Sequence, residues 1–305
     1  MAQPLMTKFR RMKPIPASEL VINADGSVYH LNLRPEQIAH TVFLVGDPGR
    51  VPRVSRHFDS IEHQVQRREF VTHTGTLAGK RLSVLSTGIG TDNIDIVLNE
   101  LDALVNIDFE TRTIKEQLTS LKLIRLGTSG CLAADIPVGS IVVSAYGIGL
   151  DNLASYYQRT VSDDEKNMEK EFEEFARSVG VDLRVYAARG SEQLLKVFNA
   201  HRAGITLTCP GFYGPQGRNL RLRSIYKPRF FDEVGKFNHS GFGITNFEME
   251  TSAIFALAGM LGHQALSCNA ILANRLRKEF AEDPAAVVNN LIEKILETVA
   301  ASEEF

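Results

Sequence analysis

The stretch LKLIRLGTSG, residues 121–130, joins an apolar, β-rich run to a glycine turn and carries a single arginine within the run. Because apolar residues occupy both faces of such a run, it is typical of an interior strand that is covered on both sides. Similar runs recur along the chain, at TVFLVGDPGR (41–50), RLSVLSTGIGT (81–91), GSIVVSAYGIG (139–149), VDLRVYAARG (181–190), GITLTCPGFYG (204–214) and QALSCNAILANR (264–275). The sequence therefore predicts several buried strands, most of which end in glycine turns.

Amphipathic segments lie between several of these strands. Ser162 and Glu165 form a capping-box pair ahead of one such segment, and Gly180 is placed to end it. Further helices are predicted after the glycine turn of 81–91, over residues 248–261, and from Asp283 and Pro284 onward. Alternation of strands and helices predicts an α/β layer structure with a largely parallel sheet.

The composition is that of an ordinary globular protein. The chain has 305 residues, of which 44% are hydrophobic and 23% charged, and this excludes disorder, collagen and coiled coil as descriptions of the whole. A formal net charge of −2 gives no general attraction to nucleic acid or to an anionic membrane, and no apolar run reaches the ~18 residues needed to span a bilayer. Three widely spaced cysteines fit a reducing cytoplasm. We expect a loosely held arm at residues 1–29 and a single domain over 30–305.

Two of the glycine turns combine glycine with arginine. Gly46 and Arg50 belong to GDPGR, and Arg125 and Thr128 belong to RLGTSG. Ligands of open α/β sheets bind beyond the carboxyl ends of the strands, where backbone N–H groups and a guanidinium suit a phosphate. An ordinary tight turn explains GDPGR equally well, and an ion pair would explain an arginine in an apolar strand. Because both turns present the same chemistry, phosphate binding is favoured.

No common cofactor site is predicted. STGIGTDN (86–93) nearly spells the dinucleotide-binding fingerprint, but Asn93 stands at the third glycine position. The chain has neither a GxxxxGK phosphate loop nor a GxSxG turn, and its eight histidines form no zinc-ligand pattern. We therefore expect no organic cofactor and no zinc site.

Two further segments carry polar groups suited to a sugar and a planar base. NFEMETS (246–252) places Glu248 and Glu250 at a strand-to-helix junction, where they either cap the helix or accept hydrogen bonds from sugar hydroxyls. FYGPQGR (212–218) sets an amide and a guanidinium two residues apart beside an aromatic ring, although a plain surface loop would look the same.

Together these segments resemble the nucleoside phosphorylase family, from about His30 to Arg275. GDPGR is similar to the family's GDPxR phosphate turn, STGIG to the strand and turn that follow, RLGTSG to its RxGT segment, and NFEMET to its EMES signature. The resemblance implies a three-layer α/β/α sandwich around a mixed, largely parallel central sheet.

The resemblance also implies a role for each matched residue. Those expected to bind phosphate are Gly46, Arg50, Arg125 and Thr128, with Arg68 lent by a neighbouring subunit. Those expected to hold the ribose are Thr128, Met249 and Glu250, with His30 closing the site from the partner. Those matching the FxxxQxR element, which reads uracil in the uridine-specific branch, are Phe212, Gln216 and Arg218. The catalytic set is then Arg125, Gln216, Arg218 and Glu250.

Substrate choice depends on the end of the late strand. That strand ends Ala273-Asn274-Arg275, without the aspartate that the purine-specific branch carries there. The implied reaction is reversible phosphorolysis of uridine to uracil and ribose 1-phosphate, with inorganic phosphate as co-substrate. The implied assembly is a homo-oligomer of dimers that share active sites. The alternatives are a purine nucleoside phosphorylase or nucleosidase of the same fold, or a non-catalytic nucleoside-binding protein.

Several features depart from the compact members of the family. The segment before His30 is longer, and the stretches 106–120 and 155–172 look like insertions. Asn93 replaces a serine that helps to hold a monovalent cation in compact members. For that reason no metal is assigned.

Overall fold

The strands form one large sheet and a small hairpin. The computed structural model describes residues 13–226 and 228–305, so residues 1–12 of the expected arm lie outside the described residues. The strands are β1 (Thr41–Val45), β2 (Ser60–Arg67), β3 (Phe70–Leu77), β4 (Lys80–Ser86), β5 (Ile107–Asp108), β6 (Thr113–Ile114), β7 (Lys122–Cys131), β8 (Ile141–Gly149), β9 (Tyr186–Arg189), β10 (Arg202–Thr208), β11 (Asn238–His239), β12 (Phe242–Glu248), β13 (Gln264–Asn274) and β14 (Glu279–Phe280). The sheet order is β11-β12-β10-β8-β13-β7-β1-β4-β3-β2, with β9 beside β8 and β14 beside β13.

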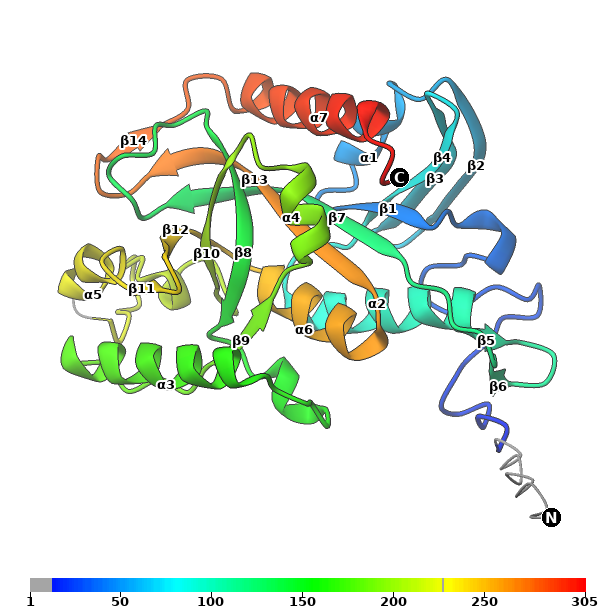
Figure 1. Cartoon of the computed structure of the whole chain (residues 1–305), viewed down its shortest axis with the longest axis horizontal. Helices are drawn as coiled ribbons and strands as arrows, with labels where there is room; N and C mark the ends of the chain where they lie inside the picture. The colour runs from blue at the N-terminus through cyan, green and yellow to red at the C-terminus, as the bar shows by residue number, and fades with distance from the viewer. Residues whose placement is uncertain (1–12, 227) are drawn as a thin grey trace, which may run out of the picture.

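Helices cover this sheet on both sides (Figure 1). They are α1 (Arg50–Ser55), α2 (Thr91–Asn106), α3 (Asp163–Ser178), α4 (Glu192–Val197), α5 (Pro228–Val234), α6 (Thr251–Leu261) and α7 (Pro284–Ala301), with 3₁₀ turns η1 (Pro35–Gln37), η2 (Leu153–Tyr156) and η3 (Gly214–Gln216). Within the described ranges, no helix combines the length and the apolar character that a membrane crossing requires.

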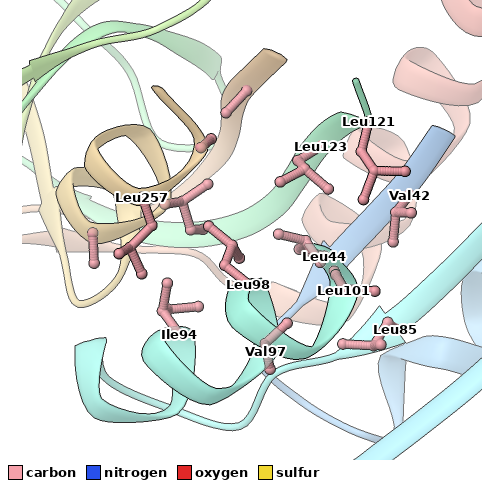
Figure 2. Close-up of a cluster of buried hydrophobic side chains, with 14 of the residues drawn as sticks. Val42, Leu44, Leu85, Ile94, Val97, Leu98, Leu101, Leu121, Leu123 and Leu257 are labelled. Carbon is pink, nitrogen blue, oxygen red and sulfur yellow. The ribbon is translucent and has the colours of Figure 1, made fainter. Parts of the chain in front are cut away.

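Strand β1 shows why the sheet is covered twice. Val42 and Leu44 point into a core shared with α2 and α6, whereas Phe43 and Val45 point into a second core shared with α1, α4 and α7. Figure 2 shows the first of these cores, where Leu98 and other apolar residues of α2 lie close to the strand residues. Alternate residues of one strand thus face opposite helix layers. The predicted α/β sandwich around a mixed sheet is confirmed.

Part of the sheet closes on itself. Neighbours β7, β13, β8, β10 and β12 form a ring, because β12 also pairs with β7 in the antiparallel sense, through Asn246 with Cys131 and Phe247 with Gly130. The parallel pairs are β4–β1, β1–β7, β7–β13, β8–β10 and β10–β12. The antiparallel pairs include the β2–β3 and β3–β4 hairpins, this closure, and β13–β8 in the middle of the sheet order. The closure was not predicted from the sequence. It brings the end of β12 against Gly130 and Cys131, because β7 continues as a strand through residues 127–130, where a glycine turn was predicted.

Most predicted helices are confirmed, with one change of boundary. Ser162 caps α3 by accepting from the Glu165 backbone N–H, and Asp283 caps α7 by accepting from the Ala286 backbone N–H at 2.9 Å. The helix predicted over 248–261 begins at Thr251, because Glu248 is still the last residue of β12. The predicted 181–190 strand is limited to β9.

The N-terminal arm and the 106–120 insertion are parts of one feature. The stretch 106–120, which was expected to be an insertion, contains the β5–β6 hairpin, and the turn residue Arg112 has a left-handed backbone with φ of 57°. The Arg112 side chain donates to the backbone carbonyls of Ile15, Pro16 and Leu20, and its own carbonyl accepts from the Ile15 N–H at 2.7 Å. The insertion therefore fastens the described part of the arm to the body of the protein.

Candidate active site

A pocket of about 810 Å³ opens beyond the carboxyl ends of the central strands. This volume lies within the range of small-molecule binding sites. The predicted site residues that line it are Gly46, Arg50, Arg125, Thr128, Phe212, Gln216, Arg218, Met249 and Glu250. The sequence segments that seemed weak one by one therefore meet in one cavity.

Arg125 is the charged centre of this pocket. It is only 6% exposed, its guanidinium contacts Glu250, and its Nη2 lies 3.2 Å from Glu248 Oε2. Its Nη1 donates to Asn269 Oδ1 at 2.8 Å. Burial opposes the charged form, but the two carboxylates outweigh it and raise the pKa of Arg125. The ion pair that was the alternative explanation is present, and the same guanidinium also lines the pocket.

Gly127 leaves the space that this guanidinium occupies. A Cβ atom at position 127 would lie 1.5 Å from Arg125 Nη1 and 2.5 Å from Asn269 Oδ1. No side chain fits at that position unless Arg125 moves. The glycine of RLGTSG is therefore explained by the arginine two residues before it.

Arg50 is a second cation near the first, and its side chain is partly buried. Its Nη1 donates to the Leu126 carbonyl at 2.9 Å, whereas its Nε is buried and has no hydrogen-bond partner among the described residues. Burial, with the positive charge of Arg125 as the next cause, lowers the pKa of Arg50 to about 10. Two neighbouring cations with an unused donor favour an anion between them, since such a group would offset their repulsion and satisfy the donor.

The two carboxylates of NFEMET have different tasks. Glu248 caps α6, because its carboxylate accepts from the backbone N–H groups of Glu250 at 2.9 Å and Thr251 at 3.0 Å, and from Thr208 Oγ1 at 2.8 Å. Burial raises the pKa of Glu248. Glu250 does not cap the helix; its side chain contacts Arg125 and accepts from the Gly90 backbone N–H at 2.7 Å. Both residues line the pocket, but helix capping explains Glu248, whereas Glu250 caps no helix.

Gly90 is a site residue that the sequence reasoning missed. It precedes α2 with φ of 96°, a conformation that favours glycine, and its N–H holds Glu250 Oε1. The sequence signal for this role is the glycine turn predicted at STGIG. A backbone N–H donor at this site could have been inferred from that turn.

The loop at the other end of the pocket is held together by arginines. Gln216 is 3% exposed, and its Oε1 accepts from Arg218 Nη1. The Arg218 guanidinium lies 3.8 Å from the centre of the Phe212 ring, which is half exposed. Arg275 donates to the backbone carbonyls of Gln216 and Gly217 and so fixes the loop from behind. This role of Arg275 was not predicted, although it ends the late strand on which the choice of base was argued.

His30 and Arg68 do not line the pocket of their own chain. Both lie close to Tyr29: the His30 and Tyr29 ring centres are 4.8 Å apart, and the Arg68 guanidinium lies 5.8 Å from the Tyr29 ring centre. The resemblance assigned both residues to the site of a neighbouring subunit. Glu69, next to Arg68, does line the pocket and was not predicted.

This chain is similar to known proteins over most of its length. The family model described as the phosphorylase superfamily matches residues 40–301. A uridine phosphorylase of Thermococcus kodakarensis is 30% identical over 89% of this chain and 87% of its own. A solved Trypanosoma brucei nucleoside phosphorylase, described as showing uridine phosphorylase activity, matches with a TM-score of 0.82 at 31% identity and covers 93% of this chain and all of its own. A DeoD-type purine nucleoside phosphorylase of Listeria monocytogenes is 28% identical over 88% of this chain and 97% of its own.

Proposed function

The chain belongs to the phosphorylase superfamily, and from this premise we propose that it catalyses the reversible phosphorolysis of uridine to uracil and ribose 1-phosphate. The observation that carries the proposal is the meeting of Arg50, Arg125 and Glu250 in one pocket with the Gln216–Arg218 loop. Relatives named for uridine phosphorylase activity support the choice of substrate.

Phosphate binds at the arginine end of the pocket. Arg50 and Arg125 supply two guanidinium groups, and the unpartnered Nε of Arg50 supplies a donor that an oxyanion would satisfy. Gly46 and Thr128 border the same space. The lowered pKa of Arg50 supports this assignment, because bound phosphate would restore the charge balance there.

Ribose lies between the two ends, next to Glu250 and Met249. The carboxylate of Glu250 is held by Arg125 and Gly90, so its position is set before a ligand arrives. Such a carboxylate accepts hydrogen bonds from the adjacent 2′- and 3′-hydroxyls. Met249 supplies an apolar surface for the sugar.

Uracil binds in the loop formed around Gln216 and Arg218. The Gln216 amide pairs with the O2 and N3 edge of the base, and Arg218 donates to O4. Cytosine carries an amino group, a hydrogen-bond donor, in place of O4. This donor faces the donor of Arg218, so binding of cytosine is disfavoured. The exposed face of Phe212 borders the base.

Catalysis is electrostatic and needs no covalent intermediate with the protein. A phosphate oxygen attacks C1′ as the C1′–N1 bond breaks through an oxocarbenium-like state, with inversion at C1′. The bonding electrons pass to the base, where Gln216 and Arg218 stabilise the charge on O2 and O4, and the uracil anion then takes a proton from water. Phosphate held below the sugar stabilises the cationic ring. The reaction requires no organic cofactor, and phosphate is a co-substrate.

The active unit is a dimer within a homo-oligomer. His30 and Arg68 lie near the same tyrosine and do not line their own pocket, which supports their use by the neighbouring subunit. A shared site then gains a third guanidinium for phosphate and a histidine for the ribose. All three cysteines are buried and unpaired, which supports a reducing, cytoplasmic location.

One assay tests the proposal. Release of the free base is measured from uridine, thymidine and inosine at the same concentrations, with and without inorganic phosphate. We expect release from uridine that depends on phosphate. Faster turnover of inosine than of uridine would indicate the purine alternative, release without phosphate would indicate a nucleosidase, and nucleoside binding without release would indicate a sensor.

A further inference from the structure

Glu100, in the middle of α2, holds a segment that lies seventy residues earlier in the chain. Its carboxylate accepts from the backbone N–H groups of His30 at 3.0 Å and Leu31 at 2.8 Å, and its Oε1 lies 2.7 Å from His30 Nδ1. The Glu100 side chain is 12% exposed, and that of His30 is 30% exposed. Both carboxylate oxygens are therefore engaged with the turn that carries His30.

This arrangement decides how the imidazole presents its nitrogens. An ionised carboxylate only accepts hydrogen bonds, so Nδ1 of His30 must be the protonated nitrogen. In the neutral ring, Nε2 then has a free lone pair and accepts a hydrogen bond. Glu100 thus fixes the tautomer as well as the direction of the ring, as carboxylates do for metal-bound and catalytic histidines.

The helix that carries Glu100 is packed against the hydrophobic core, which fixes the position of the Glu100 backbone. Leu98, Leu101 and Leu104 of the same helix are buried in the core, and Leu31 beside His30 is buried as well. Gly90 directly precedes α2, and its backbone N–H donates to Glu250 in the pocket. One rigid helix therefore positions Glu250 for its own pocket and His30 for use outside it.

We propose that Glu100 is a positioning residue that turns His30 Nε2 into an acceptor for the ribose 5′-hydroxyl in the neighbouring subunit's site. The inference rests on the proposed function, in which Glu250 takes the 2′- and 3′-hydroxyls and the 5′-hydroxyl is the one that remains. The chemistry matches, because a free hydroxyl donates readily to an imidazole lone pair.

The test compares uridine with 5′-deoxyuridine, which lacks only the hydroxyl in question. Glu100→Ala and His30→Ala should each lower kcat/KM for uridine roughly tenfold, about the size of one hydrogen bond, and leave 5′-deoxyuridine nearly unchanged. The double variant should lose no more than His30→Ala alone, since Glu100 acts through His30. Glu100→Gln, which keeps one acceptor oxygen for the backbone, should show a smaller loss of the same kind.

Retained cleavage of 5′-deoxyuridine shows in the same assay that each variant is folded. Glu297→Gln on α7 is the matched control, because its carboxylate is exposed and contacts only Lys294 among the described residues; both substrates should react as in the parent. Equal losses with the two substrates in Glu100→Ala and Glu100→Gln would overturn the inference while uridine phosphorolysis stood. A parent protein that releases no uracil from uridine would overturn the proposed function and this inference together.

Discussion

The two ends of the pocket are built in different ways. At the arginine end, Arg125, Glu248 and Glu250 are each at least nine-tenths buried and bonded to groups from several elements. At the base end, Gln216 and Arg218 belong to a loop whose aromatic neighbour Phe212 is 50% exposed. In the proposed binding mode, phosphate and ribose contact a buried network that is bonded to several elements. The base contacts a loop at the other end of the pocket, so that loop can change with little effect on the buried network.

Removal of Arg125 should give the largest effect and should break both the chemistry and the fold. Arg125→Met leaves Glu248 and Glu250 as buried carboxylates without their cation, and such a loss costs about 3–5 kcal/mol of unfolding free energy. We expect kcat/KM for uridine to fall at least ~10³-fold as well. Urea unfolding and the uracil release assay measure the two effects. Arg202→Met, at an exposed ion pair, is the control and should change neither.

Loss of Glu250 should separate chemistry from stability at the same end of the pocket. Glu250→Ala leaves Arg125 paired with Glu248, so the fold should survive, while use of the ribose hydroxyls is lost. We expect kcat/KM for uridine to fall by about 10²–10³. Activity equal to that of the parent would remove the ribose role of this carboxylate.

Loss of Arg218 should lower activity with little change in the free energy of unfolding. Arg218→Ala removes the donor to O4 and the stacking on Phe212, and we expect kcat/KM for uridine to fall about 10²-fold. The free energy of unfolding should change by less than about 1 kcal/mol, because the side chain belongs to a partly exposed loop. An unchanged uridine rate, or a stability loss as large as that of Arg125→Met, would contradict the comparison.

The smallest effect is expected far from both ends, at His239. Its ring lies 2.6 Å from Glu171 and 3.1 Å from Asp164, and Tyr146 donates to the same Asp164. Burial alone would lower the pKa of His239, but its bonds to Glu171 and Asp164 raise it overall. The resulting stability is present below the ordinary histidine pKa and is lost as pH rises through the raised value. His239→Gln should therefore flatten thermal stability between about pH 5 and 8, and uridine turnover should stay as in the parent.

The central strands could be predicted from the sequence because buried strands have strong apolar patterns. The glycine turns predicted at the ends of 121–130 and 139–149 were wrong, since β7 and β8 continue through those glycines. Arg125 and Arg50 could be placed together because parallel strands end at the same edge of a sheet. The β12–β7 closure could not be predicted, since pairing between distant strands leaves no local signal. The β2–β3 hairpin was missed for another reason: residues of β2 alternate between partly buried and exposed and lack an apolar run.

The site residues that were missed act through the backbone or from outside the motifs. Gly90 holds Glu250 with a main-chain N–H, and Arg275 holds the carbonyls of the base loop. Neither contribution depends on a residue pattern near the ligand. Arg125 was assigned to phosphate in preference to an ion pair, and the structure adds that ion pair without removing the arginine from the pocket.

The fastening of the arm by Arg112 has an evolutionary consequence. Three carbonyls of the arm accept from one side chain of the β5–β6 hairpin, and the same arm leads directly into His30. Loss of the hairpin would leave the arm carbonyls without their donor, and loss of the arm would leave the Arg112 side chain without these acceptors. We expect the two additions to be inherited together, gained or discarded as a pair across descendants of a common ancestor.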